Sequence, residues 1–346
     1  MEPKKQIMRI KKTIKIYYFF IRYLKARIST KAFMVRFIPT NRCNLRCQYC
    51  WQWQEKGQEM TGKEFSDYLS KACELGVGLI DFMGGEPLSW KHIFYAIEEC
   101  DRHNIITNLN TNGTLLNEVI IDQLGRAGLD HLNVSIDGTK KTSITKKCLE
   151  DNEQLITCLQ RANRKWGIKV RVNSVIHKSN FDDLKKLIGI LYENQIPLTL
   201  GFVVPPLGYK SRKESNIFFS SEDEELLRNI VSYILAKKRC GYKIIDPDSY
   251  FLNVFRFLKK EIFWNCNYPT RFGWINIAPS GKIRSCTKKM EDIDLNFVDI
   301  NVQKIKELKH IFKEGVSKCN RECYSNCAYD SWYFKNHQYK LFRELY

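Results

Sequence analysis

Three cysteines in one short segment could carry metal or redox chemistry. Cys43, Cys47 and Cys50 form a CxxxCxxC motif directly after a short apolar run. A loop gains little from three isolated thiols, so three this close indicate a metal or redox site. Zinc is one alternative, but it usually takes a fourth ligand nearby, and no His or further Cys follows within twenty residues. An iron–sulfur cluster on three thiolates would instead keep one iron open for a substrate or cofactor.

A second group of cysteines lies near the carboxyl end. It consists of Cys266, Cys286, Cys319, Cys323 and Cys327, with the spacing Gly281-x4-Cys286 inside it. Five cysteines within about sixty residues are typical of a metal site rather than of core packing. The remaining five are scattered singly among helical patterns, and we expect them to be small buried residues: Cys73, Cys100, Cys148, Cys158 and Cys240.

Alternating strands and helices must position these groups. Strand patterns occur at 33–38, 77–83, 106–111, 131–136, 169–176 and 198–204. Amphipathic helical patterns separate them at 63–75, 90–103, 115–127, 150–166 and 181–194. This alternation predicts an α/β fold, a partial (β/α)6 barrel of parallel strands, followed by a small cysteine-rich α+β domain. In such folds ligands bind at the carboxyl ends of the strands, where the cysteine motif falls.

The chain is expected to divide into four parts. These are an amino-terminal helix at 1–32, the barrel at 33–210, a helical linker at 211–255 and the cysteine-rich domain at 256–346. The segment 205–215 is rich in Pro, Gly and charge, which favours a boundary there.

The charge is concentrated at the amino terminus. Residues 1–36 hold 11 Lys and Arg against the single acid Glu2, which accounts for +10 of the net +18. Apolar residues recur there at three-and-four spacing, which predicts a basic amphipathic helix: Ile7, Ile10, Ile14, Tyr17, Tyr18, Ile21, Leu24 and Ile28. Such a helix packs on its own protein, lies on an anionic membrane surface, or follows nucleic acid. Its Tyr, Phe and Leu content favours an interface, so no nucleic acid partner is expected.

Composition excludes two classes of protein. With 346 residues the chain can bury a core without disulfides, and its amino terminus lacks the pattern of a secretory signal. No uninterrupted apolar run reaches the ~20 residues of a membrane span. We therefore expect a cytoplasmic protein, with residues 1–28 as a contact to the inner face of the membrane.

Further motifs stand at the ends of the predicted strands. Tyr49 precedes the last cysteine of the loop, and Gly84, Gly85, Glu86 and Pro87 end the second strand. The third strand ends in Thr-Asn-Gly with Asn112, the fourth in Ser135-Ile-Asp137-Gly, and the fifth contains Arg171 and Asn173. In this order and spacing, across residues 33–204, the chain resembles the radical S-adenosylmethionine (SAM) superfamily. The segment 139–152 departs from it, being shorter than is common in that family and without its frequent arginine.

The resemblance implies two cofactors. Cys43, Cys47 and Cys50 would hold a 4Fe-4S cluster whose open iron chelates SAM by its amino and carboxylate groups. The Gly84–Pro87 motif would receive the methionine amino group, and Tyr49, Asn112, Ser135, Asp137 and Asn173 would lie near SAM, with Arg171 as a partner of its carboxylate. Reductive cleavage of SAM would give a 5′-deoxyadenosyl radical that abstracts hydrogen from an unactivated carbon. A flavodoxin or ferredoxin would donate the electron.

The carboxyl-terminal cysteines resemble the SPASM and twitch extensions of that superfamily. In these extensions Cys-x9-15-Gly-x4-Cys forms a hairpin and later cysteines close an auxiliary cluster site. The resemblance implies one auxiliary 4Fe-4S cluster on Cys266, Cys286 and Cys327, with Cys323 as fourth ligand and Cys319 as its competitor.

The substrate is open to three interpretations. The basic helix directly before the first strand favours a lipid or membrane-linked substrate, because it could hold the barrel mouth against a bilayer. The auxiliary-cluster pattern is shared with peptide-modifying maturases. A non-catalytic iron–sulfur electron-transfer protein is the third, and the strand-end motifs argue against it.

Overall fold

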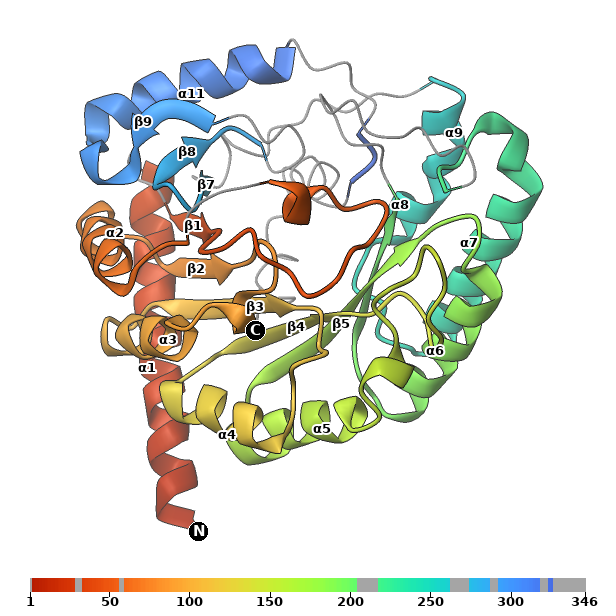
Figure 1. Cartoon of the computed structure of the whole chain (residues 1–346), viewed down its shortest axis with the longest axis horizontal. Coiled ribbons are helices and arrows are strands. Elements are labelled where there is room, and N and C mark those ends of the chain that lie inside the picture. The colour runs from red at the N-terminus through yellow and green to blue at the C-terminus, as the bar shows by residue number, and fades with distance from the viewer. Residues whose placement is uncertain are drawn as a thin grey trace.

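The computed structural model describes residues 2–28, 33–55, 59–203, 217–261, 274–286, 292–317 and 323–325. Figure 1 shows a curved sheet with helices along its outer side. Six parallel strands run in the order β6-β5-β4-β3-β2-β1. They are β1 (Met34–Phe37), β2 (Leu79–Phe82), β3 (Ile106–Thr111), β4 (His131–Ser135), β5 (Lys169–Ile176) and β6 (Leu198–Phe202).

Helices follow these strands as the alternation predicts. They are α2 (Gly62–Leu75), α3 (Ile93–Arg102), α4 (Glu118–Ala127), α5 (Leu155–Trp166), α6 (Phe181–Glu193) and α7 (Glu224–Arg239). The short α8 (Asp248–Leu252) and α9 (Val254–Leu258) come next, and α11 (Val302–Ser317) follows the last strand. The predicted partial (β/α)6 barrel is therefore confirmed.

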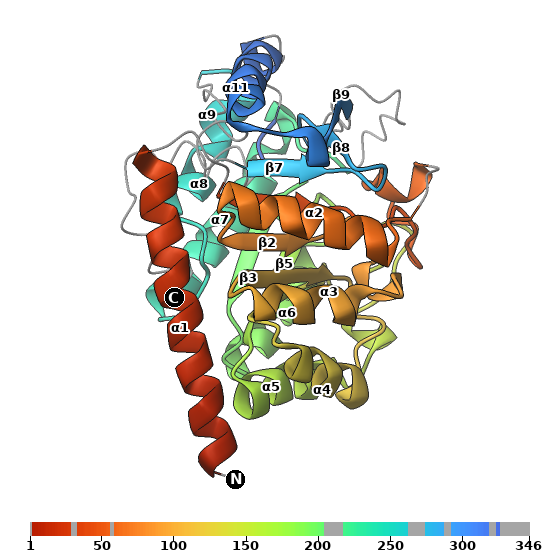
Figure 2. The same ribbon diagram turned by 90° about the vertical axis from the view of Figure 1, so that its left-hand side faces the viewer.

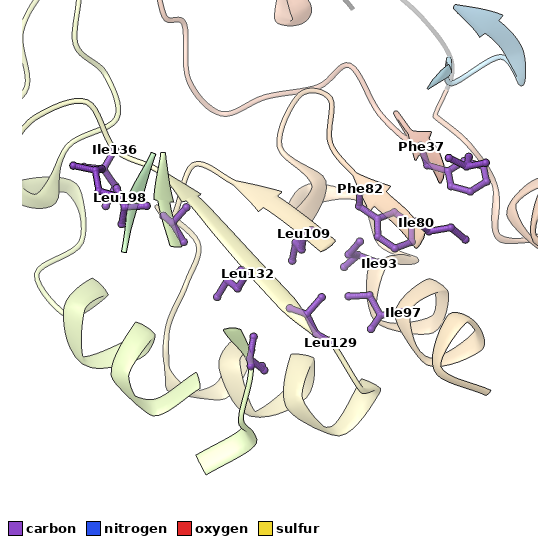
Figure 3. Close-up of a cluster of buried hydrophobic side chains, with 14 of the residues drawn as sticks. Phe37, Ile80, Phe82, Ile93, Ile97, Leu109, Leu129, Leu132, Ile136 and Leu198 are labelled. Carbon is purple, nitrogen blue, oxygen red and sulfur yellow. The ribbon is translucent and has the colours of Figure 1, made fainter. Parts of the chain in front are cut away.

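The two faces of the barrel strands differ in chemistry. On the helix side, Ile80, Phe82 and Leu109 are fully buried and pack towards α3, as Figure 3 shows. Beyond the apolar strand-start residues, the residues on the other face alternate with these and are polar. The Asp81 carboxylate accepts hydrogen bonds there from Arg36 Nε at 2.7 Å and Asn108 Nδ2 at 2.6 Å. The concave face is thus a hydrogen-bonded polar layer.

Three further strands extend this sheet beyond β1. β7 (Trp274–Ile277) pairs parallel to β1, and β8 (Lys282–Arg284) and β9 (Asp292–Asn296) continue it antiparallel. The hairpin expected around Gly281 is present, and Gly281 has a φ of +78°. An added Cβ there would lie 1.9 Å from the Tyr68 hydroxyl, so this turn requires glycine. The hairpin of the cysteine-rich segment thereby joins the barrel sheet, while the predicted domain limits stay a prediction.

The amino-terminal helix α1 (Glu2–Ile28) crosses the amino-terminal ends of the strands, opposite the loop after β1 (Figure 2). Phe19 is 1% exposed and packs with Phe33 and with the strand-start residues Met34, Leu79 and Ile106. The helix is therefore part of the folded body, and its buried side covers the barrel at the amino-terminal ends of the strands.

Basic side chains of α1 meet the carboxyl ends of three successive helices. Arg22 donates to the carbonyls of His103 and Asn104 after α3, at 3.0 and 2.8 Å. Lys15 reaches the Gly128 carbonyl after α4 at 3.4 Å, and Lys12 the Trp166 carbonyl at the end of α5 at 3.2 Å. Cations are favourable at helix carboxyl ends, because the last carbonyls lack partners within the helix. These contacts fix which side of α1 faces the protein.

That orientation reverses the expected one. The three-and-four apolar spacing suggests that the apolar side packs and the basic side is solvated. Instead Ile10, Ile14, Tyr17 and Leu24 are exposed, while Lys15 is 2% exposed. Lys15 is buried because its ammonium lies 2.5 Å from Asp130 Oδ2 and 3.1 Å from Asp101 Oδ1. The inner side of α1 therefore combines these ion pairs with the buried ring of Phe19.

The scattered cysteines follow the expectation in part. Cys100, Cys148 and Cys158 are buried and Cys73 is half-buried. Cys240 is exposed, so its expected burial is wrong, because it follows α7 at the surface.

Candidate functional site

The cysteine loop follows β1 and is tied to neighbouring loops. None of Cys43, Cys47 and Cys50 is in a disulfide, and Cys47 is 5% exposed. The Cys50 N–H donates to the Cys47 carbonyl at 3.2 Å. The Cys43 sulfur accepts from the Leu45 N–H at 3.4 Å and from the Asn112 amide at 3.8 Å. Donors directed at a sulfur suit a thiolate.

Three thiols on this loop suit an iron–sulfur cluster in their chemistry. Burial raises the pKa of Cys43 and raises that of Cys47 to about 12, so a thiolate at Cys47 requires a compensating cation. A metal supplies one, since coordination deprotonates a thiol outright. Within the ranges that the structure describes, no three His, Cys, Asp or Glu side chains lie close enough to hold a metal ion. The cluster ligands therefore stay a prediction.

The two glycines after β2 let the cysteine loop pass directly over them. The Gly85 N–H donates to the Thr40 carbonyl at 2.9 Å. An added Cβ would lie 1.9 Å from the Arg42 carbonyl oxygen at Gly85, and 2.6 Å from the Thr40 carbonyl oxygen at Gly84. Both positions therefore exclude larger residues, and the Gly-Gly pair positions the cysteine loop over the end of β2.

Glu86 joins the ends of β2 and β3. It is fully buried, and its carboxylate accepts from Thr111 Oγ1 at 2.6 Å, the Asn112 N–H at 2.8 Å and the Leu88 N–H at 3.0 Å. Leu88 lies in a short 3-10 helix, Pro87–Ser89, that starts after Glu86. Burial raises the pKa of Glu86, which these donors oppose. Glu86 thereby holds two motif loops in register, and its predicted role towards the methionine amino group stays a prediction.

Asp137 joins the cysteine loop to β5 and to Lys147. It is fully buried and accepts hydrogen bonds from the Tyr49 hydroxyl and, at 2.8 Å, from the Val175 N–H. The Lys147 ammonium lies 3.2 Å from the same carboxylate and 5.2 Å from the centre of the Tyr49 ring. The structure thus brings the predicted residues Tyr49 and Asp137 into direct contact, with Lys147 beside both.

Lys147 is a site residue that the sequence did not indicate. Burial opposes its charge, but Asp137 and the thiols of Cys47 and Cys50 raise its pKa, so it stays an ammonium beside the cysteine loop. Buried His177 lies behind Tyr49, their ring centres 6.5 Å apart, and contacts Thr145. The one signal for Lys147 in the sequence is that the segment 139–152 in which it lies departs from the family pattern.

Lys147→Met is expected to shift the reduction potential of the reconstituted cluster to more negative values and to slow SAM cleavage about tenfold. A positive charge next to the thiolates favours the more negative, reduced state. Lys146→Met is the matched control, because the Lys146 ammonium donates to the Thr142 carbonyl at the protein surface, at 3.0 Å. Potentiometric titration checks this, and equal potentials in both variants would contradict it.

Arg171 lies further from the carboxyl ends of the strands than Ser135 and Asn173 do. Ser135 and Asn173 are paired neighbours towards the carboxyl ends of β4 and β5. Arg171 instead lines a cavity of about 400 Å³, together with the strand-start residues His131 and Lys169. Its side chain would therefore have to reach the SAM carboxylate from a position nearer the amino-terminal ends of the strands than Ser135 and Asn173.

His131 makes the stability of the protein depend on pH. Burial, with the nearby charges of Lys169 and Arg171, lowers the pKa of His131 to about 3. Since the unfolded chain binds this proton near pH 6.5, stability falls as the pH drops below that value, by about 1.4 kcal/mol between pH 7.5 and 5.5. Urea unfolding of the wild type and of His131→Asn at both pH values checks this. The variant should lack this share of the pH dependence, and equal slopes would show that His131 gains its proton in the folded state.

The auxiliary-cluster cysteines are only partly described. Cys286, after β8, and Cys323 are half-buried and not in disulfides. The Cys323 sulfur lies 3.1 Å from the Ser325 hydroxyl. Cys266, Cys319 and Cys327 lie outside the described residues, so the auxiliary cluster stays a prediction.

A parallel partial barrel with three thiols on the loop after its first strand, beside a Gly-Gly-Glu-Pro turn, defines a class of iron–sulfur barrel enzymes. The family model "Radical SAM superfamily" matches residues 37–215, just over half of the chain. The chain belongs to the radical SAM superfamily. Membership implies a 4Fe-4S cluster and SAM as cofactors.

Two relatives are similar to the chain over most of its length. The chain is 27% identical over 256 residues to a PqqA peptide cyclase of Granulibacter bethesdensis, covering 71% of this chain and 65% of the relative. It is 25% identical over 320 residues to a GTP 3',8-cyclase of Clostridium botulinum, covering 84% of this chain and 95% of the relative.

Two solved structures share the fold. Streptococcus suis SuiB bound to its precursor peptide SuiA has a TM-score of 0.64 at 17% identity and covers 84% of this chain and 67% of that one. Native anSMEcpe with bound AdoMet has a TM-score of 0.61 at 18% identity and covers 90% of this chain and 99% of that one.

Proposed function

We propose that this radical SAM enzyme modifies a peptide. The match to PqqA peptide cyclases over 71% of the chain carries the proposal, since their name gives a peptide as substrate. The predicted auxiliary-cluster pattern supports it, because peptide maturases share that pattern. The reason given for a lipid substrate no longer holds. Helix α1 lies at the end of the barrel opposite the cysteine loop, so it cannot hold the barrel mouth against a bilayer (Figure 2).

We assign different roles to different residues of the proposed site. Cys43, Cys47 and Cys50 would hold the cluster, and the turn at Gly84 and Gly85 would present backbone groups to SAM. When bound and reduced, the cluster and SAM supply a radical that removes hydrogen from the substrate.

The surrounding side chains keep this site in shape. Glu86 locks the ends of β2 and β3, and Asp137 with Lys147 holds Tyr49 against the cysteine loop. A buried, hydrogen-bonded support of this kind fixes the position of the reacting groups and excludes water.

Two further parts belong to the proposal. An auxiliary 4Fe-4S cluster on Cys266, Cys286, Cys327 and either Cys323 or Cys319 would take up an electron from the product. A flavodoxin or ferredoxin would reduce the first cluster, and the reaction would take place in the cytoplasm.

The test compares substrates on the reconstituted enzyme with SAM and dithionite. Short peptides encoded beside the gene, extracted membrane lipids and GTP are added in separate reactions, and 5′-deoxyadenosine and substrate masses are measured. Peptide-dependent 5′-deoxyadenosine with a loss of hydrogen from the peptide is the expected result. Turnover that only lipid or only GTP stimulates would contradict the peptide proposal.

A further inference from the structure

The solvent side of α1 carries an apolar stripe. Ile10, Ile14, Tyr17 and Leu24 are 54%, 43%, 64% and 46% exposed. At 100° per residue these four lie within about 80° of one another around the helix. A helix on the surface of a globular protein normally turns such a stripe inward.

The helix cannot turn to bury this stripe. Phe19, Lys15 and Arg22 occupy the opposite side and contact the barrel through apolar packing, ion pairs and hydrogen bonds. Rotation would expose Phe19 and leave buried Asp130 without its ammonium partner, which is unfavourable. From Ile10 to Leu24 the stripe runs about 21 Å along a continuous helix. A straight stripe of this length suits a flat partner.

Two partners could cover the stripe, a second copy of this chain or a lipid surface, and the charge of α1 distinguishes them. Exposed Lys11 and Lys25 border one edge of the stripe. Apart from Lys12, Lys15, Arg22 and Arg36, which contact the barrel, residues 1–36 hold seven more Lys and Arg against the single acid Glu2. A second copy docked through this helix would bring the same positive charge, which opposes association. An anionic phospholipid surface offers an apolar layer below a negative one, and aromatic side chains such as Tyr17 favour that boundary.

We propose that α1 lies on an anionic phospholipid surface, with Ile10, Ile14, Tyr17 and Leu24 in the acyl boundary and its lysines among the headgroups. In the part of the chain that the structure describes, no helix is long and apolar enough to cross a membrane. The docked protein keeps the cysteine loop on the side away from the lipid, so a peptide would reach it from solvent (Figure 2). This inference rests on α1 and not on the peptide proposal.

Vesicle flotation of the full chain tests it. Vesicles of phosphatidylglycerol and phosphatidylcholine are compared with phosphatidylcholine alone. The variant Ile14→Glu/Tyr17→Glu is compared with Val119→Glu/Leu252→Glu, which adds the same charge at residues 66% and 52% exposed on α4 and α8. We expect the wild type and the second variant to float with anionic vesicles, and the first variant to bind at least about tenfold less. High salt should weaken the binding.

Three results would overturn the proposal. The wild type fails to float with anionic vesicles, both variants lose binding equally, or light scattering shows a wild-type dimer that the stripe variant alone converts to a monomer. The last result would identify a second copy as the occupant. Because Phe19, Lys15 and Arg22 stay unchanged, circular dichroism of both variants should match the wild type.

Discussion

Replacing Cys47 by alanine is expected to lower 5′-deoxyadenosine formation more than about 100-fold. Cys47 is the most buried of the three loop cysteines, and its sulfur lies near the Lys147 charge. Without it the cluster loses one of three protein ligands. The reaction is run anaerobically with dithionite and SAM, and the product is quantified by chromatography.

A thiol elsewhere provides the control. Cys158 is fully buried on α5, so Cys158→Ala makes a comparable small cavity away from the loop. It should keep its activity and its iron content. Cys47→Ala should lose one cluster's share of iron while retaining any auxiliary cluster. If Cys47→Ala keeps wild-type activity, the assignment of the cysteine loop is wrong.

Replacing Lys15 by methionine is expected to cost about 3–5 kcal/mol of the free energy of unfolding. Its ammonium is buried between Asp130 and Asp101, and Asp130 also accepts from the Thr107 N–H at 3.0 Å. The variant would leave these carboxylates without their ammonium partner, because methionine fills the space without the charge. Urea unfolding followed by circular dichroism measures the change.

Lys11 on the same helix is the matched control. Its ammonium lies 3.9 Å from Asp101, and its side chain is 68% exposed. Lys11→Met should therefore change stability by less than about 1 kcal/mol. An equal effect of the two substitutions would mean that α1 does not dock through Lys15. Deletion of the whole helix is the poorer experiment, because it would also uncover Phe33, Met34 and Leu79.

Local patterns were enough to predict the barrel. Period-two and period-3.6 spacing define elements from residues a few positions apart, so β3 and β5 begin and end where expected. Pairings between distant segments were not predictable. The parallel contact of β7 with β1 joins residues about 240 positions apart, and no spacing in the sequence encodes it.

The distinction between local patterns and distant contacts also explains which site residues the sequence predicted. The cysteines and strand-end motifs each occupy one short segment, so their order is readable. Lys147 acts through Asp137 and Tyr49, which the fold alone brings together. The orientation of α1 was missed because its partners, such as Asp130, lie 115 residues downstream of Lys15.

Helix α1 is synthesised well before the segments that it packs on. The partners of Lys12, Lys15 and Arg22 lie 81 to 155 residues further along the chain. At 5–20 residues per second, the ribosome needs on the order of 10 s to make them. Throughout that interval α1 has no barrel to dock on, and both of its sides stay open to whatever the nascent chain meets.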